Sequence, residues 1–238
     1  TRTGTSKAGP ALAASVPSKG QQHEGPRPTT PGVHVERQPA MVIPAARLKF
    51  YRRVSTLAAL ASSADDSAER LVRSLLYLWQ RRSFGHLLPA RAPWRTSDYL
   101  QDGAVLDFAN WLAEQPLNEA AYWLATAYAV WVGEETRTKR ALFFTPPALA
   151  DRVIANLVKQ GAPLTNHPWH DPACGGAAFL VPIARGMAVA LAQTGLTPDE
   201  QLARIARNLS GNDLDPVLLD LSRSFLEMAL SALVRVAG

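Results

Sequence analysis

The chain has 238 residues, of which 47% are apolar, and 25 Lys and Arg against 20 Asp and Glu give a net charge of +5. It can therefore bury a core in one or two domains, and its charge permits an anionic partner without requiring one. The single cysteine excludes an internal disulfide framework and fits a reducing compartment, so we expect a cytoplasmic protein. The longest apolar run, residues 120–132, is too short to cross a bilayer, and no membrane partner is expected.

Residues 1–44 are rich in proline and glycine and contain no aromatic residue. Such a segment cannot bury enough surface to offset its ordering entropy, which predicts a disordered tail. An organelle transit peptide is a weaker alternative, because no amphipathic period is visible.

Residues 45–133 predict a helical domain. Asp65 and Asp66 can cap a helix that ends at Gly85, prolines 89 and 93 mark a loop, and a second helical region is broken near Pro116 before it resumes to Gly133. The first helix carries an apolar stripe made of Leu71, Val72, Leu75, Leu76 and Trp79. The resumed helix is apolar almost all round, which predicts burial on most faces.

Residues 134–238 predict the start of an α/β fold. After a charged connector at 134–140, Thr145 is a plausible N-cap for a helix with a buried stripe of Leu149, Ile154 and Leu157. Short strands are expected before Asp171 and at residues 209–213. Helices are expected near 177–192, after Thr197 with Glu200 completing a capping box, and from a cap at Asp215. This order predicts a parallel sheet.

The most informative stretch is D-P-A-C-G-G-A-A-F-L at 171–180, where a strand would turn into a helix. Gly175 and Gly176 would let a ligand approach the main chain, and free N–H groups at the helix start suit a carboxylate or phosphate. Asp213, at the second strand end, can accept hydrogen bonds from a ribose. An ordinary tight turn is the simpler interpretation of the glycine pair taken alone.

Other chemistries fit less well. The glycine spacing does not match G-x-G-x-x-G, and no G-x-x-x-x-G-K-[ST] loop exists. Cys174 has no assigned base, and His167 and His170 lack the further ligands of a zinc site, so no metal is expected. The cluster Arg81, Arg82, Arg91 and Arg95 with Trp79 and Trp94, like the group Arg137, Lys139 and Arg140, fits phosphate binding and solvated helix ends equally well.

Three motifs in order resemble the adenine-specific N6 DNA methyltransferases of restriction-modification systems. The family's F-x-T-P-P resembles F-F-T-P-P at 143–147, its D-P-A-C-G-S-G-x-F-L resembles 171–180, and its G-x-[DE]-x-D-P resembles G-N-D-L-D-P at 211–216. The match covers about residues 134–238, and a helical N-terminal domain is similar to what such enzymes carry.

The resemblance implies the first part of a Rossmann-like methyltransferase fold, with a parallel sheet that is incomplete in this chain, and S-adenosyl-L-methionine as cofactor. Asp171 and the 173–176 backbone would hold the methionine end, Thr145 with Phe144 would line the pocket, and Asp213 would take the ribose hydroxyls. Double-stranded DNA and a restriction or specificity subunit are the implied partners. The implied cofactor-binding residues are Phe144, Thr145, Pro146, Asp171, Pro172, Ala173, Cys174, Gly175, Gly176, Phe179 and Asp213.

The chain departs from the family in three respects, one of which is that the strand before Asp171 reads N-H-P-W-H and is less apolar than a buried strand. Ala177 stands where the family usually has glycine, which would cost on the order of 1 kcal/mol if φ is positive there. The later [DN]-P-P-[YFW] motif, which holds the flipped adenine, is not in this chain, and N-H-P-W at 166–169 is interpreted as a loop. We therefore expect this chain to contain no catalytic residues and to be inactive on its own.

Two alternatives stay open. A truncated methyltransferase-like module could bind DNA or a protein partner without turnover. The acceptor could also be RNA or protein, because the three motifs report on the cofactor and only the resemblance points to DNA.

Overall fold

The computed structural model describes residues 44–87 and 99–237, and the descriptions below refer to these ranges. The predicted tail, apart from Pro44, and the loop at prolines 89 and 93 lie outside them. The described residues are mostly helical with one small parallel sheet, which is compatible with the expected α/β class. The elements are α1 (Pro44–Thr56), α2 (Ala58–Ala61), α3 (Ser67–Phe84), α4 (Gly103–Ala113), α5 (Leu117–Trp131), α6 (Glu134–Lys139), α7 (Pro147–Lys159), β1 (Trp169–Asp171), α8 (Leu180–Leu191), α9 (Pro198–Asn208), β2 (Leu209–Gly211), α10 (Pro216–Ala229) and α11 (Ser231–Ala237).

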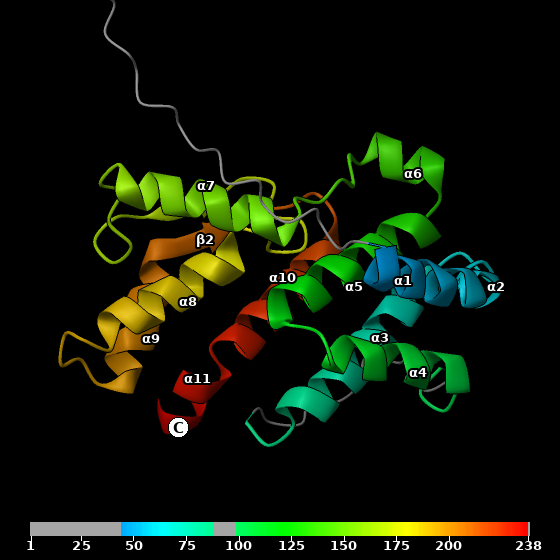
Figure 1. Cartoon of the computed structure of the whole chain (residues 1–238), viewed down its shortest axis with the longest axis horizontal. Helices are drawn as coiled ribbons and strands as arrows, with labels where there is room; N and C mark the ends of the chain where they lie inside the picture. Colours follow the sequence, from blue (N-terminus) through cyan, green and yellow to red (C-terminus); the bar gives the residue numbers. More distant parts are fainter. Residues whose placement is uncertain (1–43, 88–98, 238) are drawn as a thin grey trace, which may run out of the picture. The chain divides into compact units, whose positions relative to one another are not determined.

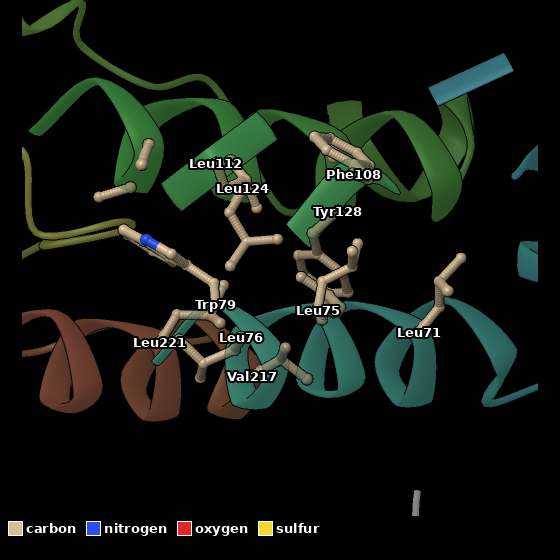
Figure 2. Packing of buried hydrophobic residues seen from close by; sticks show 14 of the residues in the cluster. Leu71, Leu75, Leu76, Trp79, Phe108, Leu112, Leu124, Tyr128, Val217 and Leu221 are labelled. Atoms are coloured by element: carbon tan, nitrogen blue, oxygen red, sulfur yellow. The ribbon is translucent and has the colours of Figure 1, made fainter. Parts of the chain in front are cut away.

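The main core joins helices from both halves of the described chain. Helix α10 packs against α3 and α5 (Figure 1). Figure 2 shows side chains of α3, α4, α5 and α10 meeting, among them Trp79, Leu124 and Leu221. The predicted stripe of α3 is buried, with Leu71 and Leu75 fully inaccessible. Residues on both sides of the expected boundary at 133 and 134 thus contribute to one core.

Polar contacts reinforce the packing between the two halves. Arg73 of α3 donates to Asp220 of α10 at 2.5 Å, with both side chains mostly buried. A pair shielded from water in this way is screened less by salt than a surface pair.

Several helix boundaries follow the predicted capping chemistry. The predicted break at Pro116 is confirmed, because α4 ends at Ala113 and Pro116 precedes α5. The Thr197–Glu200 capping box and the Asp215 cap are confirmed as well. Gly85 ends α3 as expected. Asp66 lies at the predicted N-cap position of α3, but its side chain accepts no capping hydrogen bond.

Three local predictions are wrong. Residues 134–139 of the expected connector form α6, because two acids at its start and two cations at its end favour a helix. Pro146, and not Thr145, precedes α7, and its ring offers no side-chain cap. The stripe expected to be buried on α7 is largely exposed, with Leu149 at 51% and Leu157 at 40%. Ile154, the third residue of the stripe, is half-buried and packs against a second core cluster that includes Ile183 and Met187, so the apolar face of α7 is covered in part.

The sheet consists of β1 and β2 in parallel, joined by a crossover through α8 and α9. Trp169 faces Leu209, His170 faces Ser210, and Asp171 faces Gly211. The crossover returns the chain in the same direction, so both strands end at the same edge of the sheet. The loops that follow them are the segments that carry the chemistry predicted above.

Candidate functional site

The two loops after the strands continue the pairing of β1 and β2. Asn212 N–H donates to Asp171 C=O at 2.9 Å, and Cys174 N–H donates to Asn212 C=O at 2.8 Å. The loop of residues 172–179 and the loop of residues 212–215 are therefore hydrogen-bonded side by side. The structure brings Asp171 and Asp213 to one edge of the sheet, although 42 positions separate them in sequence.

The Asp213 carboxylate fixes both loops. Its Oδ2 accepts from Gly175 N–H at 2.8 Å and its Oδ1 accepts from Asp215 N–H at 2.9 Å. The side chain is half-buried. A carboxylate has about four lone-pair sites, so Asp213 keeps capacity for further donors. Asp171 plays a smaller part of the same kind, with Oδ1 accepting from Ala173 N–H at 3.1 Å.

The glycines of the first loop have packing reasons of their own. Gly175 has φ +49°, and a Cβ there would lie 3.2 Å from the Phe144 ring. A Cβ on Gly176 would lie 2.8 Å from Ala125 Cβ of α5, closer than side chains approach. The glycines thus let this loop lie directly on Phe144 and on α5.

Ala177 adopts φ +59°, so the left-handed backbone suspected from the sequence is present. Its N–H donates to Cys174 C=O at 2.7 Å, which closes a tight turn. The residue is 1% exposed. An L-residue in this region costs roughly 1–2 kcal/mol, which the surrounding packing must offset.

Cys174 faces the interior and holds the loop from behind. It is 4% exposed, its thiol contacts Ser222 Oγ, and Ser222 Oγ donates to Gly175 C=O at 2.5 Å. Burial is the largest cause that raises the pKa of the Cys174 thiol, which disfavours the nucleophilic thiolate. The side chain of Cys174 is therefore a structural support of the loop.

The third motif lies against the first loop. Phe144, Thr145 and Pro147 line a cavity together with Gly176 and Ala177, and the cavity volume is about 20 Å³. This space holds one or two water-sized groups and not a nucleoside. Pro146 is exposed beside it.

Helix α5 closes the other side of this cavity, and sequence reasoning missed its contribution. Its contribution to the lining is Asn118, Ala121, Tyr122 and Ala125. Asn118 Oδ1 is buried and has no hydrogen-bond partner among residues 44–87 and 99–237. No sequence signal could have found it, since its position depends on how α5 packs against residues far along the chain.

The predicted cap of α10, Asp215, also belongs to a buried network that sequence reasoning missed. Asp215 is 1% exposed and accepts from Tyr128 Oη at 3.1 Å and from Arg140 at 2.8 Å, besides capping α10 through Val217 and Leu218 N–H. Burial first, and then the Asp215 charge, raise the pKa of Tyr128. The hydrogen bond to Asp215 raises the pKa of Arg140. This network, which we call the Asp215 cluster, ties the helical segment to the second loop.

The members of the two predicted basic clusters lie in different environments in the structure. Trp79 is a core residue at 1% exposure, and Arg91, Trp94 and Arg95 lie outside the described residues. Arg81 and Arg82 line a groove of about 440 Å³ with Tyr77, Gln101 and Asn110. In the second group, Arg140 belongs to the Asp215 cluster, and Arg137 pairs with Glu134 and lies over the Phe143 ring.

The remaining predicted residues line a groove beside β1. Pro172 and Phe179 lie there with Asp171, Trp169 and apolar side chains of α7, around a volume of about 250 Å³. His170 contacts Ser210 Oγ through Nδ1 at 2.9 Å. In the part of the chain that the structure describes, no three His, Cys, Asp or Glu side chains come together as a metal site would require.

None of the helices within residues 44–87 and 99–237 combines the length and apolar character that a membrane span needs. Comparison with family models, with curated proteins and with solved structures finds no match for this chain. Its function must therefore be argued from the site itself.

Proposed function

We propose that residues 134–238 are the cofactor-binding portion of a site-specific DNA methyltransferase that transfers a methyl group from S-adenosylmethionine to adenine N6. One observation carries this proposal: the three motifs converge. The loop 172–179 contacts both the loop 212–215 and Phe144 of the segment 143–147, at the carboxyl ends of two parallel strands. Ligands of open parallel sheets bind outside these ends. Motif order in a sequence does not itself require the motifs to touch.

The residues at this junction fit the cofactor's chemistry. Asp213 is held in place by two N–H donors and retains lone pairs for ribose hydroxyls. Asp171 and the 173–176 backbone would hold the methionine end, and Thr145 would line it. The bound cofactor supplies a methyl group already activated by its sulfonium. The chain's own contribution is then to orient the cofactor and to exclude water.

In this proposal β1 and β2 are two strands of a larger Rossmann-like sheet. Two three-residue strands are short for an independent sheet, and parallel sheets are normally covered on both faces. The exposed apolar face of α7 next to β1 is consistent with further elements there. The groups that hold the flipped adenine would lie on those elements, so we expect no methyl transfer by this chain alone.

The DNA partner is proposed from the resemblance, and one surface of the helical segment is compatible with it. Arg81 and Arg82 line the groove of about 440 Å³, where Gln101 and Asn110 add hydrogen-bonding groups. Guanidinium groups of this kind contact phosphates without reading sequence. A restriction or specificity subunit is a further partner that the resemblance implies.

A non-catalytic module that binds DNA or protein is the second candidate. The observation that favours it is the cavity of about 20 Å³ at the junction of the motifs, which takes only one end of a cofactor. The remainder of the cofactor would then lie across the open edge of the sheet. The methyltransferase portion should bind S-adenosylmethionine and the non-catalytic module should not, so a binding measurement distinguishes the two candidates.

The test is calorimetric titration of S-adenosylmethionine into the full chain and into the Asp213→Ala variant. We expect saturable binding that the substitution removes. Ser222→Ala is the matched control, because it loosens the same loop from the buried side without removing a ligand contact. If the folded chain does not bind S-adenosylmethionine, the proposal is refuted, and the non-catalytic binding module remains as the candidate function.

A further inference from the structure

Asp213, the residue assigned above to the ribose, is held in part by the residue two positions later. Its Oδ1 accepts from Asp215 N–H at 2.9 Å, and its Oδ2 accepts from Gly175 N–H at 2.8 Å. Leu214, between the two acids, is 96% exposed and can do little to anchor this loop. The orientation of the Asp213 carboxylate therefore depends on two N–H donors, one of which moves with Asp215.

The Asp215 carboxylate accepts hydrogen bonds from its own helix and from two earlier segments. Val217 and Leu218 N–H of α10 donate to Oδ1. Tyr128 Oη of α5 donates to Oδ2 at 3.1 Å, and Arg140 donates to Oδ2 at 2.8 Å. Tyr128 and Arg140 are thus the contacts that join this carboxylate to earlier parts of the chain. Asp215 is 1% exposed, whereas the side chain of Arg140 is 47% exposed and can be replaced with less disturbance of the core.

Arg140 also connects the third motif to the segment that leads into the first. It lies shortly before residues 143–147, and Leu142 between them is 3% exposed and belongs to the main core. Residues 143–147 in turn lie against the loop 172–179. The pair of Arg140 with Asp215 therefore completes a set of contacts in which each of the three motif segments is joined to the other two.

Arg140 supplies the positive charge in a group of acids. Asp213 and Asp215 are two positions apart, and the charge of Glu69 on α3 acts on both Tyr128 and Arg140. Removing one partner of a charge pair leaves a buried carboxylate uncompensated. We expect Asp215 to move toward water when Arg140 is lost, and its N–H would then move away from Asp213.

We propose that Arg140 is a positioning residue for the ribose of the cofactor, and that it acts through Asp215 to keep the Asp213 carboxylate oriented toward the ribose hydroxyls. The inference rests on the proposed function. Arg140 does not have to touch the cofactor in this role. Recognition of the ribose would then depend on a residue outside the three motifs, as well as on the two loops after the strands.

The test measures by calorimetry how strongly the full chain distinguishes S-adenosylhomocysteine from its 2′,3′-dideoxy analogue, which lacks both ribose hydroxyls. The ratio of the two dissociation constants reports on the hydroxyl contacts, and a smaller folded fraction does not change it. For the wild-type chain we expect a ratio of at least about 10, the usual effect of losing a hydrogen bond to a charged group. Arg140→Ala should lower the ratio to about 3 or less. Arg140→Lys keeps a cation and should restore most of it.

The matched control is Arg137→Ala, the same substitution three positions earlier, where the side chain pairs with Glu134 and lies over the Phe143 ring. It should leave the ratio unchanged. Tyr128→Phe removes the other contact to Asp215 and should also lower the ratio, which keeps the test decisive if Arg140→Ala does not fold. Ratios in both variants equal to the wild-type ratio would overturn this inference and leave the proposed function standing. A wild-type chain that binds neither ligand would overturn both proposals.

Discussion

At the scale of single residues, Gly211 is a position with little room for a side chain. A Cβ there would lie 2.6 Å from Leu180 Cδ1 and 3.0 Å from Cys174 Cβ. Leu180 can move its side-chain end, but Cys174 is held by its hydrogen-bonded loop. We expect Gly211→Ala to lower the free energy of unfolding by about 1–3 kcal/mol, measured by urea titration. Gly103→Ala, at the open start of α4, is the control and should be neutral or slightly stabilising.

Tyr128 gives a prediction in pH. Its folded pKa is raised above the ordinary 10.0, so the unfolded chain loses this phenolic proton first as pH rises. The stability that Tyr128 contributes is therefore complete below about pH 10 and is lost as pH rises toward the folded pKa. Tyr128→Phe should be about 1.5–3 kcal/mol less stable at pH 8, because Asp215 loses a donor.

The difference between Tyr128→Phe and the wild-type chain should shrink above pH 10. Urea titrations at pH 8 and pH 11 measure it. A difference that stays constant between these two pH values would mean that Tyr128 is not buried against Asp215 as described.

The sequence could predict the two loops and Asp213, which joins them, but not the residues of α5 that pack against them. Asp171, Gly175 and Asp213 could be singled out because motif and turn chemistry are local, and the structure brings them together. Asn118 and Tyr128 were not found, because their importance comes from contacts with residues far away in the chain. Tyr128, for example, is 87 positions from Asp215. From the sequence alone, a tyrosine in an apolar helix predicts only a buried side chain. The carboxylate that accepts its hydrogen bond is known only from the fold.

At the scale of elements, two helix caps of different burial allow a comparison. Thr197 caps α9 at an exposed site, and we expect Thr197→Ala to cost about 1 kcal/mol. Asp215 caps α10 inside the Asp215 cluster, and Asp215→Ala should cost about 3 kcal/mol or more, because Tyr128 also loses its acceptor. Thermal and urea unfolding of both variants measure the difference. Equal losses would show that the cluster contributes nothing beyond the cap.

The apolar period of a helix predicts burial correctly for α3 but not for most of α7. The stripe on α3 correctly predicted a buried face, since α4, α5 and α10 cover it. The stripe on α7 is just as regular, yet Leu149 and Leu157 are exposed. A period indicates that one face of a helix is apolar, but it carries no information about whether another element covers that face.

At the scale of the molecule, the shared core predicts cooperative unfolding of the described residues 44–87 and 99–237, which belong to one compact unit. Phe225 of α10 packs against Trp79 of α3, with ring centroids 5.7 Å apart. Tryptophan fluorescence reports mainly on residues before 133, and far-ultraviolet circular dichroism reports on all helices. We expect the two thermal transitions to coincide. Separate midpoints would indicate that the helical and α/β segments unfold independently.

The exposed apolar side chains of α7 have a practical consequence for handling the protein. Leu149, Val153, Leu157 and Val158 expose apolar surface next to a strand whose outer edge has no partner strand among the described residues. Patches and edges of this kind lower colloidal stability, because they adhere to whatever apolar surface or strand they meet. The concentration at which the chain stays monodisperse should therefore rise when Leu157 is replaced by lysine, and light scattering would record the change before any activity assay is attempted.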